Sequence, residues 1–137
     1  MALLDIRNLS VEFHTEEGVV RAVDQASFQI PRGKTVCLVG ESGCGKSVSS
    51  YALLGLVSPP GRVVEGEAIL DGQDLLKLPE SDLRSIRGNR ISMIFQEPMT
   101  SLNPVFTIGD QIIEAILSHQ DMSKNTAREK AISMLKR

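Results

Sequence analysis

The stretch "GESGCGKS", residues 40–47, follows a short apolar run and precedes a run that is typical of a helix. Its spacing, a glycine, four residues, then Gly45, Lys46 and Ser47, fits the pattern G-x-x-x-x-G-K-[ST] of a phosphate-binding loop. Gly40 and Gly45 allow backbone angles that a β-carbon forbids. The loop can therefore curl until successive N–H groups point inward and form a nest for an anion.

The positions of this loop have separate predicted roles. Lys46 would reach the β- and γ-phosphates of a nucleoside triphosphate, and the Ser47 hydroxyl would ligate Mg²⁺. The N-terminus of the following helix would add partial positive charge. A glycine-rich turn without chemistry is the alternative interpretation. We predict that the triphosphate is held by nine consecutive residues: Gly40, Glu41, Ser42, Gly43, Cys44, Gly45, Lys46, Ser47 and Val48.

The segments on both sides favour the phosphate-binding interpretation. Residues 35–39, "TVCLV", are typical of a short buried strand, and residues 50–57 of a mostly apolar helix. Strand, loop and helix in this order are the arrangement that the motif requires.

Composition narrows the class of protein. The chain has 137 residues, enough for one small domain or part of a larger one, and its net charge of −2 does not suggest nucleic acid as the main partner. It contains no apolar run near twenty residues, and its N-terminus lacks a signal-peptide layout. Cys37 and Cys44 have neither a metal-binding spacing nor a disulfide framework. We therefore expect a chain of the reducing cytosol that does not itself cross a membrane.

The remaining pattern alternates between strands and helices. The dipeptide Asp71-Gly72 predicts a tight turn, and Thr107 and Ser123 are predicted N-caps. The last helix reaches Arg137 without a stop signal, so we expect the sequence to be the N-terminal part of a longer domain. Strands are predicted at 3–13, 19–23, 26–30, 63–70 and 91–95, and helices at 79–87, 107–119 and 124–137.

Two segments together resemble a known family. Residues 39–57, "VGESGCGKSVSSYALLGLV", and 91–112, "ISMIFQEPMTSLNPVFTIGDQI", are similar to the ATP-binding subunits of ABC transporters, in particular those of oligopeptide and dipeptide importers. The resemblance implies an α/β fold, a P-loop NTPase core of the ABC ATPase type with an N-terminal antiparallel β subdomain. It places the β subdomain and core in 1–104 and the start of a helical subdomain in 105–137. The family's signature loop, catalytic glutamate and switch histidine would lie beyond this sequence.

The resemblance also assigns roles outside the loop. Gln96 would contact Mg²⁺ and the attacking water, and would act in catalysis together with Lys46; a surface loop residue is the alternative. Phe13 would be the platform for adenine, with His14 and Val20 beside it, or else a core side chain of the first strand.

A docking face and partners follow from the same resemblance. Glu97, Pro98 and residues 101–104 would shape the face that docks onto a permease, or would only form a capped turn. The implied function is an ATP- and Mg²⁺-dependent motor subunit of a peptide importer, peripheral at the cytoplasmic face of the inner membrane. Its partners would be permease subunits, a second ATP-binding subunit and, indirectly, a periplasmic or extracellular substrate-binding protein.

Other functions remain open at this point. Nickel and glutathione importers have very similar motors, so the cargo is weakly defined. A GTPase or small-molecule kinase would share the loop, but the sequence has no N-K-x-D guanine motif. A truncated chain that binds nucleotide without hydrolysis is a third possibility, and we expect the 137 residues alone not to hydrolyse ATP at a family-like rate.

Overall fold

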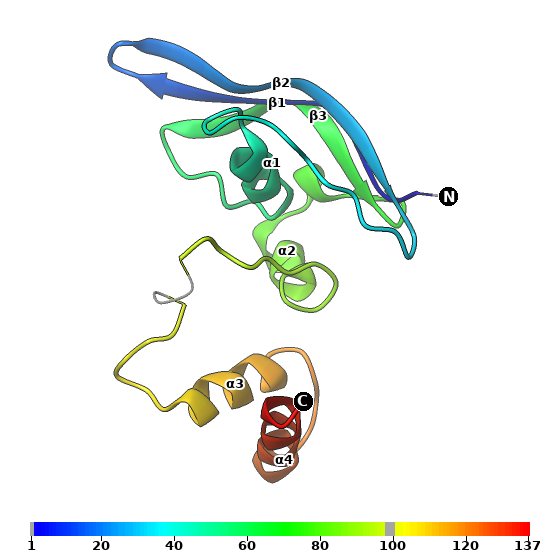
Figure 1. Ribbon diagram of the computed structural model, residues 1–137, viewed down its shortest axis with the longest axis vertical. Helices are drawn as coiled ribbons and strands as arrows, with labels where there is room; N and C mark the ends of the chain where they lie inside the picture. The colour runs from blue at the N-terminus through cyan, green and yellow to red at the C-terminus, as the bar shows by residue number, and fades with distance from the viewer. Residues whose placement is uncertain (1, 98–100) are drawn as a thin grey trace. The chain divides into compact units, whose positions relative to one another are not determined.

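The computed structural model describes residues 2–97 and 101–137. The chain forms two compact units, one ending at Leu83 and one beginning at Arg84 (Figure 1). Pro98, which the sequence placed on a docking face, lies outside the described residues. The predicted subdomain limits, 1–104 and 105–137, stay a prediction.

The first unit is built on an antiparallel sheet with the strand order β2–β1–β3–β4 (Figure 1). The predicted strands at 3–13 and 63–70 are confirmed, whereas the runs at 19–23 and 26–30 join into one strand because register shifts let the pairing with β1 continue through the polar residues between them. The turn at Asp71-Gly72 is confirmed, with φ angles of 50° and 85°. The strands are β1 (Ala2–Thr15), β2 (Gly18–Pro31), β3 (Gly61–Leu70) and β4 (Gln73–Asp74).

One face of this sheet and helix α1 (Lys46–Leu53) form the core of the first unit. The alternation of buried residues in β1 changes phase at Asn8, which has a φ of 47° and lies at a register shift. Leu9 and Val11 are therefore fully buried after the bulge. The buried apolar side chains of this unit are Leu4, Ile6, Leu9, Val11, Val23, Ala52, Leu53, Leu54, Ala68, Leu70, Leu75 and Leu83. Leu75 belongs to a short 3₁₀ helix (Leu75–Lys77).

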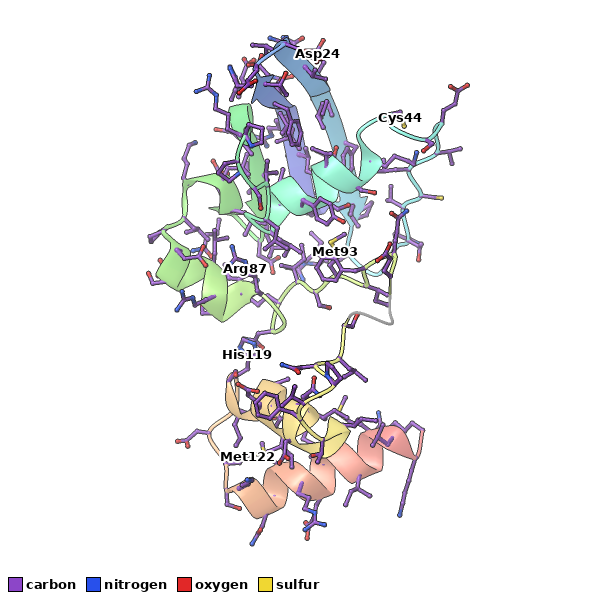
Figure 2. All side chains as sticks on the ribbon, turned by 90° about the vertical axis from the view of Figure 1, so that its left-hand side faces the viewer. Asp24, Cys44, Arg87, Met93, His119 and Met122 are labelled. Atoms are coloured by element: carbon purple, nitrogen blue, oxygen red, sulfur yellow. The ribbon has the colours of Figure 1, made fainter. Side chains whose placement is uncertain are left out.

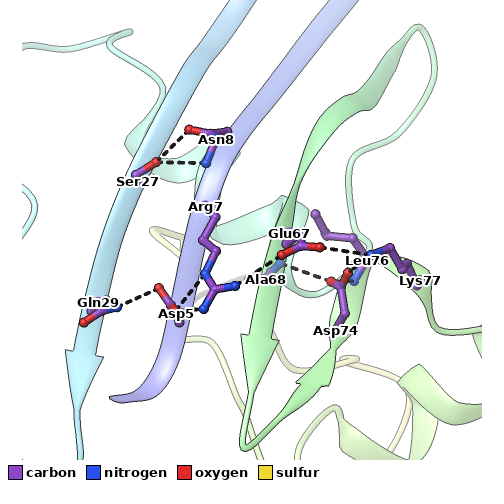
Figure 3. Close-up of polar contacts among 10 residues, drawn as sticks. All are labelled: Asp5, Arg7, Asn8, Ser27, Gln29, Glu67, Ala68, Asp74, Leu76 and Lys77. Atoms are coloured by element: carbon purple, nitrogen blue, oxygen red, sulfur yellow. Dashed lines mark hydrogen bonds and ion pairs between the residues drawn. The ribbon is translucent and has the colours of Figure 1, made fainter. Parts of the chain in front are cut away.

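The sheet also carries a ladder of polar side chains across its strands (Figure 3). Asp5 accepts hydrogen bonds from Gln29 on β2, at 3.0 Å, and from Arg7 at 2.9 and 2.6 Å. Arg7 also lies 3.5 Å from Glu67 on β3, and Glu67 is 3.2 Å from Lys77. The ladder therefore links β2, β1 and β3 on their surface.

Two predicted strands are wrong. Residues 35–39 belong to no strand, and Val39 is 90% exposed. Residues 91–95 form only a single bridge, between Ile91 and Arg87, and Ile94 is 96% exposed. A strand needs hydrogen bonds from a neighbour, and apart from the Ile91–Arg87 bridge no segment of the described chain pairs with either run.

The second unit contains two helices, α3 (Ile108–Leu117) and α4 (Lys124–Leu135). The predicted N-caps are confirmed: Thr107 accepts from the N–H of Asp110 at 3.1 Å, and Ser123 from that of Thr126 at 3.2 Å. The two helices pack through Ile113, Ile116, Ala127 and Ala131. A further helix, α2 (Glu80–Ile86), contains the residues at which the two units meet in the sequence.

Candidate phosphate-binding site

The phosphate loop, residues 40–47, has a left-handed backbone at two of its three glycines; the prediction of such an angle holds for Gly45 but is wrong for Gly40. Gly43 and Gly45 have φ angles of 82° and 86°, a region that side chains disfavour. A Cβ on Gly45 would lie 2.2 Å from the carbonyl oxygen of Ala22 on β2. Gly45 therefore has to be glycine both for its backbone angle and for its close approach to the sheet.

The side chain of Lys46 hydrogen-bonds to residues of its own loop. Its Nζ donates to the carbonyl oxygens of Gly40 and Glu41, at 2.8 and 2.6 Å, and to Sγ of Cys44 at 3.2 Å. Figure 2 labels Cys44 on the segment that leads into α1. A Cβ on Gly40 would lie 2.5 Å from the same sulfur, so the curl has no room for a larger residue. The result is one fixed positive charge within a curl of backbone.

Lys46 is also the first residue of α1, so its charge belongs to the N-terminus of this helix. The first N–H to bond within the helix is that of Ser49, which donates to the Gly45 carbonyl at 2.8 Å, and no side chain caps the helix. The N–H groups of Lys46, Ser47 and Val48 are therefore left for an external acceptor. Three donors and an ammonium at one place fit an anion such as a phosphate chain.

Ser47 could ligate a metal. Its side chain is exposed, and no described residue hydrogen-bonds to its hydroxyl. Within residues 2–97 and 101–137, no group of three or more His, Cys, Asp or Glu side chains could hold a metal alone. A Mg²⁺ ion commonly takes one or two protein ligands together with phosphate oxygens and water, so the site fits Mg²⁺ only as a partner of a bound phosphate chain.

Phe13 lies on β1 between Val20 of β2 and Gly61 of β3. A Cβ on Gly61 would be 2.6 Å from the Phe13 ring, so the ring packs directly over this glycine. The ring is half-buried, which leaves part of it exposed. The Phe13 ring therefore packs on Gly61, and its role as a platform for adenine stays a prediction.

An ion-pair cluster stands beside Phe13. Arg21 donates to Glu12 at 2.9 Å, and His14 lies 3.2 Å from the same carboxylate. The hydrogen bond from Arg21, assisted by His14, holds the pKa of Glu12 below its ordinary value. Glu12 and His14 flank Phe13 in β1, and successive side chains of a strand point to opposite faces, so this charged cluster lies on the face of the sheet opposite to the Phe13 ring.

Gln96 belongs to the second unit and is exposed, as is Glu97. Their predicted roles, at the metal and at a permease, stay predictions. The structure adds a detail for the Asn103 loop, residues 101–106: Gln111 accepts from the N–H of Asn103 at 2.8 Å and donates to the carbonyls of Asn103 and Phe106 at 2.9 and 3.1 Å. One amide of α3 thus makes three hydrogen bonds to the loop, of which residues 101–104 belong to the predicted docking face.

The sequence did not reveal three residues of these sites. The carbonyl of Ala22 has no sequence signal, because any residue carries one. Ser49 had a signal, since a serine three and four residues before Ala52 and Leu53 lies on the apolar face of a helix. The role of Gln111 depends on a loop conformation that the sequence pattern does not specify.

Comparison with known proteins identifies the family. The family model described as ABC transporter matches residues 23–137, and the chain belongs to this family. It is 50% identical over 135 residues to the dipeptide transport ATP-binding protein DppD of Escherichia coli, covering 98% of this chain and 41% of that protein. It is 48% identical over 134 residues to the oligopeptide transport ATP-binding protein AppD of Bacillus subtilis, covering 97% and 41%. The chain thus spans about two fifths of the length of these relatives.

Solved structures show the same fold. The dimeric structure of MJ0796, a bacterial ABC transporter cassette, superposes with a TM-score of 0.82 at 25% identity, over 97% of this chain and 56% of that one. A post-hydrolysis state of the same cassette, bound to ADP and Pi, gives a TM-score of 0.81 at 23% identity with the same coverage. The predicted fold, the ABC ATPase type with an antiparallel β subdomain, is therefore confirmed. No helix of the described residues has the length and apolar character needed to cross a bilayer.

Proposed function

We propose that this chain binds Mg-ATP through residues 40–48, as the nucleotide-binding part of a motor that drives peptide import. The observation that carries the proposal is the Lys46 ammonium, held within a glycine curl at an uncapped helix N-terminus. The relatives support the nucleotide and the cargo class, because their names describe ATP-binding proteins of dipeptide and oligopeptide transport.

A bound phosphate would replace the present hydrogen-bond partners of Lys46. The present partners of Lys46 are two neutral carbonyls and a thiol. A phosphate oxygen would replace them because it carries a negative charge that attracts the ammonium, which a neutral acceptor does not. The free N–H groups at the start of α1 complete the cradle. The Ser47 hydroxyl would hold Mg²⁺, which neutralises charge on the β- and γ-phosphates. Phe13 would stack on the adenine.

The wider machinery follows from the family. Gln96 would sense the metal and the attacking water, and the Asn103 loop would meet a permease at the cytoplasmic face of the inner membrane. A second ATP-binding subunit and a substrate-binding protein would complete the importer. Phosphoryl transfer needs a positioned water as well as a cradle, and residues 1–137 provide the cradle, one lysine and one glutamine. The chain alone would therefore bind nucleotide without family-like turnover.

Substitution of Lys46 tests this proposal. Lys46→Ala should weaken Mg-ATP binding by about tenfold to 150-fold, the range that corresponds to hydrogen bonds with a charged group. Lys34→Ala, which removes an exposed lysine of the same unit outside the loop, is the matched control and should bind as the parent chain does. Binding is measured with a fluorescent ATP analogue, and phosphate release is followed in parallel. Equal affinity of the Lys46→Ala and parent chains would refute the assignment.

A further inference from the structure

The carbonyl of Gly45 is held by two donors from one residue. Ser49 donates its N–H at 2.8 Å and its Oγ at 2.9 Å to this oxygen. Ser49 is 6% exposed, and it is one of two buried polar residues, with Ser10, in the part of the chain that the structure describes. A buried hydroxyl needs a partner, and the partner here is the carbonyl of Gly45, the N-cap residue just before the helix.

This bond orients the next N–H. The Gly45 carbonyl and the Lys46 N–H belong to one planar trans peptide, so they point in opposite directions. Because the carbonyl is drawn along the helix, the Lys46 N–H is aimed out of the helix N-terminus. This N–H is among the donors that have no acceptor within the helix.

The sheet blocks the other side of the same peptide. A Cβ on Gly45 would lie 2.2 Å from the Ala22 carbonyl and 3.2 Å from Cγ2 of Val23, which is itself buried. The register of β1 and β2 passes from Val11 opposite Val23 to Glu12 opposite Arg21, so Ala22 is the extra residue of a bulge. Gly45 is thus confined between this bulge and Ser49.

We infer that Ser49 is a positioning residue for the phosphate cradle: its hydroxyl fixes the Gly45–Lys46 peptide so that the Lys46 N–H faces a bound phosphate. The inference rests on the proposed function, since it concerns the same ligand. Ser49 touches no phosphate itself. It acts on the triphosphate end of the nucleotide and leaves the base end untouched.

Two ligands and four variants test this inference in the purified chain. Mg-ATP and inorganic triphosphate are titrated calorimetrically, at a temperature where circular dichroism shows every variant folded. Ser49→Ala should weaken both ligands by the same factor, about five- to tenfold, which corresponds to one hydrogen bond of ordinary net strength. Ser49→Thr keeps the hydroxyl, and threonine in a helix can bond the carbonyl four residues back, so its affinities should stay within about twofold of the parent.

The matched control removes the same type of bond elsewhere. Ser118 at the end of α3 donates its Oγ to the Glu114 carbonyl at 2.8 Å, also four residues back. Ser118→Ala should leave both affinities unchanged. If Ser49→Ala does not fold, Ser49→Cys replaces it, because a thiol has a similar size but is a weak donor.

Several results would overturn the inference. Equal affinities of the parent and Ser49→Ala would show that the hydroxyl does not orient the cradle. A loss for ATP without a loss for triphosphate would place its effect at the base. A Ser49→Thr chain as weak as Ser49→Ala would show that packing alone matters. A parent chain that binds neither ligand would overturn the proposed function together with this inference, and is distinguished from the other results by the parent titration.

Discussion

In the phosphate loop and in the Asn103 loop, one side chain makes three hydrogen bonds to the loop, but the chemistry of these bonds differs. Lys46 gives three donors to two carbonyls and a thiol in its own loop. Gln111 gives one acceptor and two donors to backbone groups of the other loop. In the proposed function the ammonium would exchange its neutral partners for a phosphate, whereas the amide already matches both kinds of backbone group. The proposal therefore expects the first loop to change its hydrogen bonds when a phosphate binds, and the second loop to keep one conformation.

The largest effect is expected from substitution of Gly45, which has no room for a side chain. Gly45→Ala combines a left-handed backbone with a clash against the Ala22 carbonyl, so it should destabilise the first unit by about 2–5 kcal/mol and abolish Mg-ATP binding. Gly43→Ala is the matched control, because its φ is also left-handed but no atom lies within 4 Å of the added Cβ. It should cost only about 1–2 kcal/mol. Urea unfolding of both variants gives the free energies, and equal losses would mean that the contact with β2 is unimportant.

Substitution of Phe13 tests whether the nucleotide-binding site includes part of the sheet as well as the phosphate loop. Phe13→Ala should weaken Mg-ATP by about five- to 150-fold, since stacking on a base contributes about 1–3 kcal/mol in nucleic-acid complexes, and should spare inorganic triphosphate. Phe28→Ala, the loss of another half-buried ring, opposite Ile6 in the same strand pair, is the control. If Phe13→Ala weakens both ligands equally, the ring over Gly61 is a packing residue only.

The sequence predicted features that depend on a few adjacent residues and missed those that depend on distant ones. Local signals were sufficient for the left-handed backbone at Gly45, for the caps Thr107 and Ser123, and for the turn at Asp71-Gly72, because each is decided by a few adjacent residues. The strands at 35–39 and 91–95 were wrong because an apolar run becomes a strand only beside a partner, which the pattern of one segment does not reveal. The contacts of Gly45 with Ala22 and of Gln111 with its loop depend on residues far apart or on loop conformation, which periodicity does not encode.

Gln111→Ala tests whether the Gln111 side chain keeps the Asn103 loop in one conformation. It removes three hydrogen bonds, each contributing about 0.5–1.5 kcal/mol, and should accelerate amide hydrogen exchange at Asn103 by about tenfold or more. The N–H of Asp110, which bonds to Thr107, is the internal control and should stay protected. Gln111→Glu keeps an acceptor for Asn103 but turns negative charge toward two carbonyls, so exchange should accelerate there too. Unchanged exchange in both variants would mean that other contacts hold the loop.

The smallest effect is expected away from both loops, at Asp5 in the surface ladder (Figure 3). The hydrogen bond from Gln29, followed by that from Arg7, lowers the pKa of Asp5 from 3.8. The unfolded chain then binds this proton at higher pH than the folded chain, so the stabilisation is complete above pH 3.8 and is lost as pH falls through the lower folded pKa. Asp5→Asn should lower the urea midpoint slightly at neutral pH and progressively less in acid. Asp121→Asn, an exposed aspartate of the second unit, is the control, and a difference between the parent and Asp5→Asn that stays constant as the pH falls would show that the ladder stabilises the sheet without its charge.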